Sequence, residues 1–174
     1  MDENLLVATP SGRHPWSAIA TFRDRSFRAS IGRAGLTADK HEGDGASPIG
    51  TWSMRQLLFR PDRVTPKTAL AMQPIRPEDG WCDDPTHRDY NRLVKLPFDA
   101  RHEELWRKDN LYDLVVLLGY NDDPPVAGKG SAIFLHVLAQ DRDPTAGCLA
   151  IGRDELLLVL AQIGRSAAVQ FRPA

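Results

Sequence analysis

Glycine and proline divide this chain into short pieces, and that division constrains the fold more than any other feature of the sequence. Thirteen residues of each type are spread over 174 positions, which leaves little room for long helices. Several of the intervening pieces alternate apolar and polar residues, the period of a half-buried β-strand. We therefore expect a mainly β fold with a few short helices.

The apolar runs predict individual elements. Residues 16–32 indicate a hairpin with its turn at Asp24, because small and apolar residues alternate with polar ones on both sides. Further strands are expected at 50–59, 111–120, 131–137, 147–152 and 167–173.

Two segments have helical character. Residues 99–112 predict a short helix, and residues 152–165 predict a clearer one with Asp154 as N-cap and Gly164 at its end. Residues 60–100 are rich in Pro, Asp and Arg and lack a strong period. They predict a long insertion over the surface.

The length favours a single domain, residues 1–174, large enough to bury a core without a metal or a disulfide framework. The formal net charge is −1 and no basic stripe stands out, so we expect no nucleic-acid partner. Acidic residues follow Met1, and the apolar patch at residues 5–8 is short. The sequence therefore predicts no secretory signal and no membrane span, which by itself indicates a cytoplasmic protein.

One histidine and one cysteine suggest chemistry. His136 ends an apolar run, and Cys148 follows the small-residue corner "PTAG". Neighbouring strands would bring imidazole and thiol together, and a nearby base activates a thiol as a nucleophile. The backbone N–H groups of Ala146, Gly147 and Cys148 are the candidate oxyanion hole. The alternative is that both residues are simply buried in the core, which is common for free cysteine and which spacing alone favours.

Other patterns carry weaker signals. Cys82, Asp83, Asp84 and His87 suggest a metal site, but no second ligand cluster accompanies them, so turn chemistry is the better interpretation. Residues 43–50, "GDGASPIG", lack the Lys-Ser/Thr ending of a phosphate loop. No Gly-x-Ser-x-Gly elbow is present, which argues against a serine hydrolase.

The segment from His136 to "TAGC" (145–148) resembles the signature of the L,D-transpeptidases, the YkuD-domain enzymes of bacterial peptidoglycan. Residues 44–52, "DGASPIGTW", are similar to the segment that precedes that signature in the family. The strand, Gly-rich turn and strand at 114–122 and 128–136 are also similar to those that lead to the family's histidine. The resemblance covers about residues 15–172.

The resemblance implies a YkuD-like β-sandwich or flattened barrel and acyl transfer through a thioester. Cys148 would be the nucleophile and His136 the base, oriented by a backbone carbonyl. No metal or organic cofactor would be needed. The partners implied are peptidoglycan stem peptides, as acyl donor and as amine acceptor, and carbapenem-type inhibitors. The residues expected to contact substrate are Thr145, Tyr120, Asn121 and Trp81.

The chain also departs from the family pattern. Val137 stands where a glycine usually follows the histidine, Ala146 where a histidine is common, and Ala150 where Arg or Asn is common. The loop between His136 and Cys148 is short. These departures indicate a divergent branch, similar to the proteobacterial enzymes that join L-Ala at position 1 to meso-diaminopimelate at position 3.

Two other functions remain open at this stage. One is a peptidoglycan hydrolase on the same fold, in which water replaces the acceptor amine, and the other is a non-catalytic peptidoglycan-binding domain. The substrate implies a periplasmic protein with a role in cell-wall cross-linking and cell shape, although the sequence shows no signal peptide.

Overall fold

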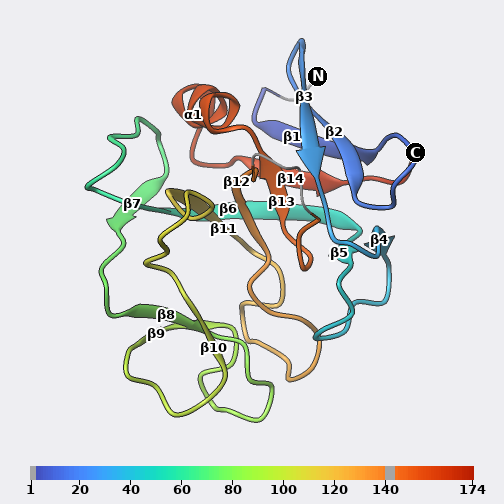
Figure 1. The fold of residues 1–174 in the computed structure, drawn as a ribbon. Helices are drawn as coiled ribbons and strands as arrows, with labels where there is room; N and C mark the ends of the chain where they lie inside the picture. Colours follow the sequence, from blue (N-terminus) through green and yellow to red (C-terminus); the bar gives the residue numbers. More distant parts are fainter. Residues whose placement is uncertain (1–2, 140–143) are drawn as a thin grey trace.

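The computed structural model describes residues 3–139 and 144–174, and most of its regular structure is β (Figure 1). The prediction of a mainly β fold is confirmed. The strands and the helix run as follows: β1 Leu5–Pro10, β2 Ser17–Phe22, β3 Arg25–Ser30, β4 Leu36–Thr37, β5 Ser47–Pro48, β6 Gly50–Phe59, β7 Ala71–Pro74, β8 Asp79–Cys82, β9 Arg92–Lys95, β10 His102–Glu104, β11 Leu114–Leu118, β12 Phe134–Val137, β13 Leu149–Ile151, α1 Arg153–Gln162 and β14 Ala168–Phe171.

Most strands belong to one nine-stranded sheet in the order β11-β12-β13-β3-β2-β1-β14-β6-β7. An additional antiparallel pairing between β11 and β6 closes this sheet into a barrel, and β7 pairs parallel with the second half of β6. Closure leaves the ring of strands without free edges, which protects short strands from pairing with other chains. The flattened-barrel prediction fits this arrangement.

The predicted hairpin is confirmed as β2 and β3, which pair antiparallel from Ser17↔Ser30 to Phe22↔Arg25 around a turn at residues 23–24. The strands expected at 50–59, 111–120, 131–137, 147–152 and 167–173 are all present, most of them shorter than predicted. Strand β1, which pairs with both β2 and β14, was not predicted.

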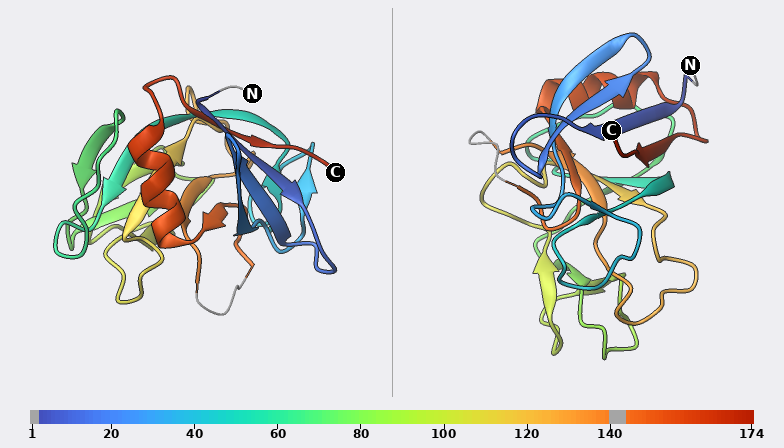
Figure 2. Two further views of the ribbon diagram at one scale, coloured as in Figure 1. Left: turned by 90° about the horizontal axis from the view of Figure 1, so that it is seen from above. Right: turned by 90° about the vertical axis from the view of Figure 1, so that its right-hand side faces the viewer.

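A second sheet of three strands, in the order β10-β8-β9, lies on the opposite side of the barrel from α1 (Figure 1; Figure 2, right). Two of its strands come from the segment predicted as a long insertion at 60–100, so this segment is not only loop. Weak periodicity concealed the strands because each is only four residues long.

The helix predicted at 99–112 is wrong. Residues 102–104 form β10, which pairs with β8 through His102↔Cys82 and Glu104↔Gly80. The Asp109 side chain then accepts a hydrogen bond from the Leu111 N–H at 3.2 Å, a turn contact that competes with helical bonding. Pairing with a distant strand therefore overrides local helix propensity.

The second predicted helix is confirmed as α1, but its N-cap is Gly152 and not Asp154. Asp154 lies in the first turn, where a negative charge faces the positive end of the helix dipole. The helix ends at Gln162, before Gly164. Its apolar side chains join the larger of two buried apolar clusters.

Strand β12 divides these two clusters. Ile133, Leu135 and Val137 face the larger cluster inside the barrel, and Phe134 faces a smaller one beneath the three-stranded sheet. Cys148 belongs to the smaller cluster. Side chains along this strand alternate between the two clusters, and this alternation turns His136 toward the second sheet and not toward the barrel interior.

Candidate active site

His136 and Cys148 are brought together by the pairing of β12 with β13. The two strands are parallel, with Leu135 opposite Leu149 and His136 opposite Ala150. One step back along this register, Cys148 lies level with Phe134, so its side chain is a diagonal neighbour of the imidazole on the same face. The expectation of two neighbouring strands is met. Residues 140–143, in the middle of the loop that was predicted to be short, lie outside the described residues.

The corner before Cys148 depends on Gly147. Its φ is 144°, a region that favours glycine, and a Cβ atom there would lie 2.9 Å from the Ala46 carbonyl oxygen. A substitution at this position would therefore be strained and would also collide with backbone. The glycine lets the chain turn directly into β13 and presents the thiol at the start of that strand.

The Ser47 hydroxyl stabilises this corner through hydrogen bonds to its backbone. Its hydroxyl donates to the Gly147 carbonyl at 2.7 Å and lies 3.3 Å from the Cys148 carbonyl, while the Gly32 N–H donates to it at 2.9 Å. The side chain is fully buried. Ser47 lies in the "DGASPIG" segment, so this segment serves the cysteine corner and is not a phosphate loop.

Thr145 supports the corner from within. Its hydroxyl donates to the Cys148 carbonyl at 2.8 Å, and it accepts a hydrogen bond from the Gly147 N–H at 3.1 Å. Of the three N–H groups expected to bind an oxyanion, that of Gly147 therefore already has an acceptor. The N–H groups of Cys148 and Ala146 remain the candidate donors.

The thiol is held by backbone groups. Cys148 Sγ donates to the Ala132 carbonyl at 3.1 Å and accepts from the Phe134 N–H at 3.4 Å. Burial, together with the charge of Glu103, raises the pKa of this thiol to about 12. The cysteine is therefore a neutral thiol at rest.

The imidazole of His136 is oriented by a backbone carbonyl. His136 Nδ1 lies 2.9 Å from the Val137 carbonyl, so it carries the proton and Nε2 is left as the proton acceptor. Burial lowers the pKa of His136 to about 4, so the ring is neutral at physiological pH. Within the described residues no hydrogen bond joins imidazole to thiol, and the resting site is a neutral pair rather than a thiolate–imidazolium ion pair.

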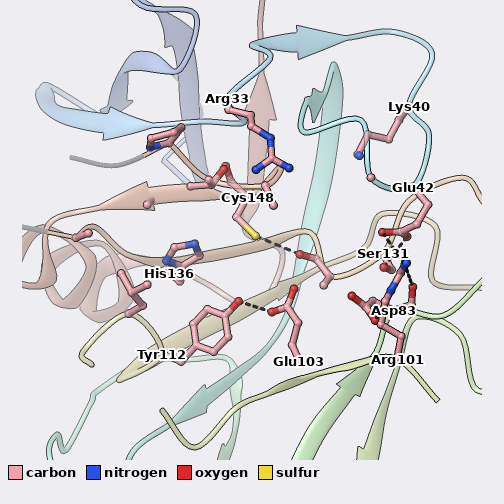
Figure 3. Close-up of a pocket in the computed structure, with 18 residues that line it drawn as sticks. Arg33, Lys40, Glu42, Asp83, Arg101, Glu103, Tyr112, Ser131, His136 and Cys148 are labelled. Carbon is pink, nitrogen blue, oxygen red and sulfur yellow. Dashed lines mark hydrogen bonds and ion pairs between the residues drawn. The ribbon is translucent and has the colours of Figure 1, made fainter. Parts of the chain in front are cut away.

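Both side chains line one cavity of about 380 Å³ that also receives residues from the second sheet (Figure 3). In Figure 3, Cys148 lies between Arg33 on one side and Glu103 on the other. Ala150 lines the same cavity, and its small side chain leaves space beside the imidazole to which it is paired. A cavity of this size accommodates part of a peptide.

Charged side chains form the wall away from His136. Lys40 Nζ lies 2.5 Å from Asp44. Arg101 lies 3.1 Å from Asp83 and 3.8 Å from Glu42. Most of these charges therefore have a partner of opposite sign, and the wall is polar without a strong excess of either charge.

The predicted substrate residues separate into two groups. Thr145 lines the cavity, whereas Tyr120, Asn121 and Trp81 are not among its described lining residues. Trp81 donates its indole N–H to Asn91 Oδ1 at 3.0 Å, and Asn91 Nδ2 donates to the carbonyls of Tyr120 at 3.2 Å and Asn121 at 2.7 Å. Contact of these three residues with substrate stays a prediction. Their position away from the cavity lining does not favour it.

Asn91 itself was missed, although it connects those residues to the site. Its Oδ1 accepts a hydrogen bond from the Ala132 N–H at 2.9 Å, and the Ala132 carbonyl accepts one from the Cys148 thiol. Asn91 and Ala132 both have a positive φ, of 56° and 52°. A buried asparagine therefore fixes the strained backbone on which the thiol rests.

Two further cavity residues, Glu103 and Tyr112, were not predicted. Tyr112 donates its hydroxyl to Glu103 at 2.6 Å, and its ring lies edge-on to the His136 ring, with centroids 5.4 Å apart. Neither residue lies in a motif. Both lie in the segment at 99–112 that was wrongly predicted as a helix, so no local signal could identify them.

The second cysteine lies elsewhere. Cys82 is fully buried in β8 and is not among the described residues that line the cavity. Its neighbour Asp84 accepts hydrogen bonds from the Thr86 N–H and hydroxyl, which is turn chemistry. In residues 3–139 and 144–174, no group of three His, Cys, Asp or Glu side chains is arranged to hold a metal. No helix in the same residues is long and apolar enough to cross a membrane.

Comparison with protein families yields a match over nearly the whole chain. The model described as the L,D-transpeptidase catalytic domain, YkuD, matches residues 8–169. A search of curated proteins finds no match.

Proposed function

Because the chain belongs to the YkuD family of L,D-transpeptidase catalytic domains, we propose that it cross-links peptidoglycan stem peptides through a thioester on Cys148. The resemblance noted in the sequence is confirmed by the family match, and the barrel-like sheet agrees with the fold of that family. The observation that carries the proposal is the shared cavity of Cys148 and His136, in which His136 Nδ1 bonds to a carbonyl and leaves Nε2 free.

The choice between the two cysteines rests on surroundings. Cys148 lies in a cavity beside a histidine, whereas Cys82 is enclosed in β8. A nucleophile needs access to substrate and a base, and only Cys148 has both within the described residues.

Acylation begins from the neutral pair. Cys148 Sγ attacks a carbonyl carbon of the donor stem while its proton passes to His136 Nε2, because a free thiolate is too costly in this buried position. The N–H groups of Cys148 and Ala146 stabilise the oxyanion. The carbon–nitrogen bond then breaks, the leaving amine takes the proton from Nε2, and a thioester remains.

Deacylation transfers the acyl group to an amine of a second stem. The amine attacks the thioester carbonyl carbon, its proton passes to His136 Nε2, the carbon–sulfur bond breaks, and the thiol is restored by that proton. The small Ala150 opposite His136 leaves room for the acceptor. The proposal extends to a linkage between L-Ala at position 1 and meso-diaminopimelate at position 3, and to a periplasmic site of action where that substrate is found.

Muropeptide analysis tests the proposal. Purified sacculi are incubated with wild-type protein, Cys148→Ala and the matched control Cys82→Ala, and the products are identified by mass spectrometry. New dimers with wild type and Cys82→Ala, and none with Cys148→Ala, are expected, and their fragmentation identifies the linkage. Shortened stems without dimers would replace transfer by hydrolysis. Unchanged sacculi with all three proteins would refute a catalytic role.

A further inference from the structure

Glu103 places a carboxylate in the cavity that holds the nucleophile and the base. It comes from β10 of the three-stranded sheet, whereas Cys148 and His136 come from the barrel. Figure 3 shows its side chain pointing into the cavity below Cys148, with the Tyr112 hydroxyl at its carboxylate. Tyr112 in turn packs against His136, so the carboxylate lies beside the reacting groups.

This carboxylate differs from its acidic neighbours in having no cation partner. Asp83 and Glu42 both lie within ion-pair distance of Arg101. Within residues 3–139 and 144–174, no Lys, Arg or His forms an ion pair with Glu103, and its hydrogen-bond donor is the uncharged Tyr112. A carboxylate in a partly dry cavity without a counter-charge is unfavourable, and binding of a cation from outside relieves that cost.

The charges around Glu103 reinforce this tendency. Burial is the main cause that raises the pKa of its carboxyl, and the charges of Asp83 and Glu42 raise it as well, while Arg107 and the Tyr112 hydroxyl lower it. A group that binds a proton readily at this position is suited to remove one from an amine.

We propose that Glu103 is a catalytic residue for the second half of the reaction: it binds the ammonium group of the acceptor stem and removes its proton. This inference rests on the proposed function. An amine stem enters as R–NH₃⁺, which lacks the lone pair needed for attack. One N–H proton passes to the Glu103 carboxylate and gives R–NH₂ and a carboxylic acid. The neutral amine then attacks the thioester as described above, and the carboxylic acid later releases its proton to solvent.

The same charge gives no benefit to acylation. Glu103 raises the pKa of the Cys148 thiol, because a nearby negative charge disfavours the thiolate. Removal of the charge should therefore leave acylation unchanged or make it faster, while transfer to a charged amine becomes slower. This opposite effect on the two halves separates an acceptor site from a merely structural role.

The test compares Glu103→Gln with Glu104→Gln. The glutamine can still accept the Tyr112 hydroxyl, so the variant keeps its local hydrogen bond, and Glu104 is the exposed next residue of β10. Acylation is measured as the rate of carbapenem adduct formation by mass spectrometry. Transfer is measured with muropeptide donors and two acceptors: meso-diaminopimelate, whose amines are charged at neutral pH, and hydroxylamine, which is uncharged.

We expect Glu103→Gln to form the adduct at least as fast as wild type and to keep transfer to hydroxylamine. Its transfer to diaminopimelate should fall about tenfold or more, the effect of losing one charge-assisted hydrogen bond. Glu104→Gln should match wild type throughout.

Equal transfer to diaminopimelate by Glu103→Gln and wild type would overturn the inference, as would an equal loss with both acceptors. The proposed function fails in a different way. If wild-type protein forms neither adduct nor transfer product with any donor, the transpeptidase assignment is lost, and the inference with it.

Discussion

Replacement of Ser47 by alanine should loosen the cysteine corner, and its cost follows from three hydrogen bonds. The alanine leaves the buried Gly32 N–H without its acceptor and the Gly147 carbonyl without its 2.7 Å donor. The Cys148 carbonyl keeps the Thr145 hydroxyl, so its loss is smaller. Two buried backbone groups left unsatisfied cost about 1–3 kcal/mol each, and we expect a loss of about 2–6 kcal/mol in the free energy of unfolding.

Urea denaturation followed by tryptophan fluorescence measures this change. The midpoint should fall while the m-value stays constant, because Ser47→Ala changes the stability and not the surface exposed on unfolding. Ser26→Ala is the matched control, since Ser26 is exposed and its hydroxyl lies 3.3 Å from Thr21. It should change stability by no more than about 0.5 kcal/mol.

The result that would refute the reasoning is a Ser47→Ala variant as stable as the control. That outcome would mean that water or a backbone shift satisfies both groups, although Ser47 is fully buried. Under conditions where Ser47→Ala is still folded, we also expect slower acylation, because the hydroxyl holds the backbone on both sides of the thiol.

Other predictions concern Cys148 and His136 and the residues that hold the backbone around them. Alkylation of Cys148 by iodoacetamide in a Cys82→Ala background should rise about tenfold per pH unit up to about pH 9, as expected for a thiol with a pKa of about 12; a plateau near neutral pH would indicate a resident ion pair. Because the pKa of His136 is lowered from 6.5 to about 4 in the folded protein, stability should fall as the pH drops through that window, by up to about 3 kcal/mol; a His136→Gln variant with the same acid dependence would contradict this. Gly147→Ala should abolish adduct formation because of its φ and its close backbone neighbour, and an active variant would show that the corner can rearrange. Asn91→Ala removes four hydrogen bonds and should lower the melting temperature by several degrees, at about 2–4 °C per kcal/mol in a domain of this size, whereas an unchanged melting temperature would contradict a structural role for Asn91.

The site could be predicted where its geometry is local in sequence. Alternation along 131–137 determines which way His136 faces, and the small residues before Cys148 determine the corner, so both residues could be chosen without coordinates. His136 and Cys148 lie close together because of one strand pairing, that of β12 with β13.

The rest of the site depends on contacts between distant segments. Glu103 reaches the cavity only because β10 pairs with β8, and residues 99–112 by themselves favour a helix. Trp81 and Asn121 are of a suitable type for a binding groove, but the Trp81 indole N–H and the Asn121 carbonyl are both hydrogen-bonded to Asn91. Residue type and loop position cannot predict these hydrogen bonds, since the partners come from distant segments that only the fold brings together.

The separate origin of the cavity's two sides has an evolutionary consequence. The barrel carries the thiol and the imidazole, whereas Glu103 lies on a small sheet that contacts the barrel through an apolar cluster and through the hydrogen bonds of Asn91. Under the proposed function, mutations in β8 and β10 that spare Asn91 would alter which amine is accepted while the register of β12 and β13 stays under independent selection. Lineages with the same cysteine and histidine would then be free to diversify their acceptors through this small sheet.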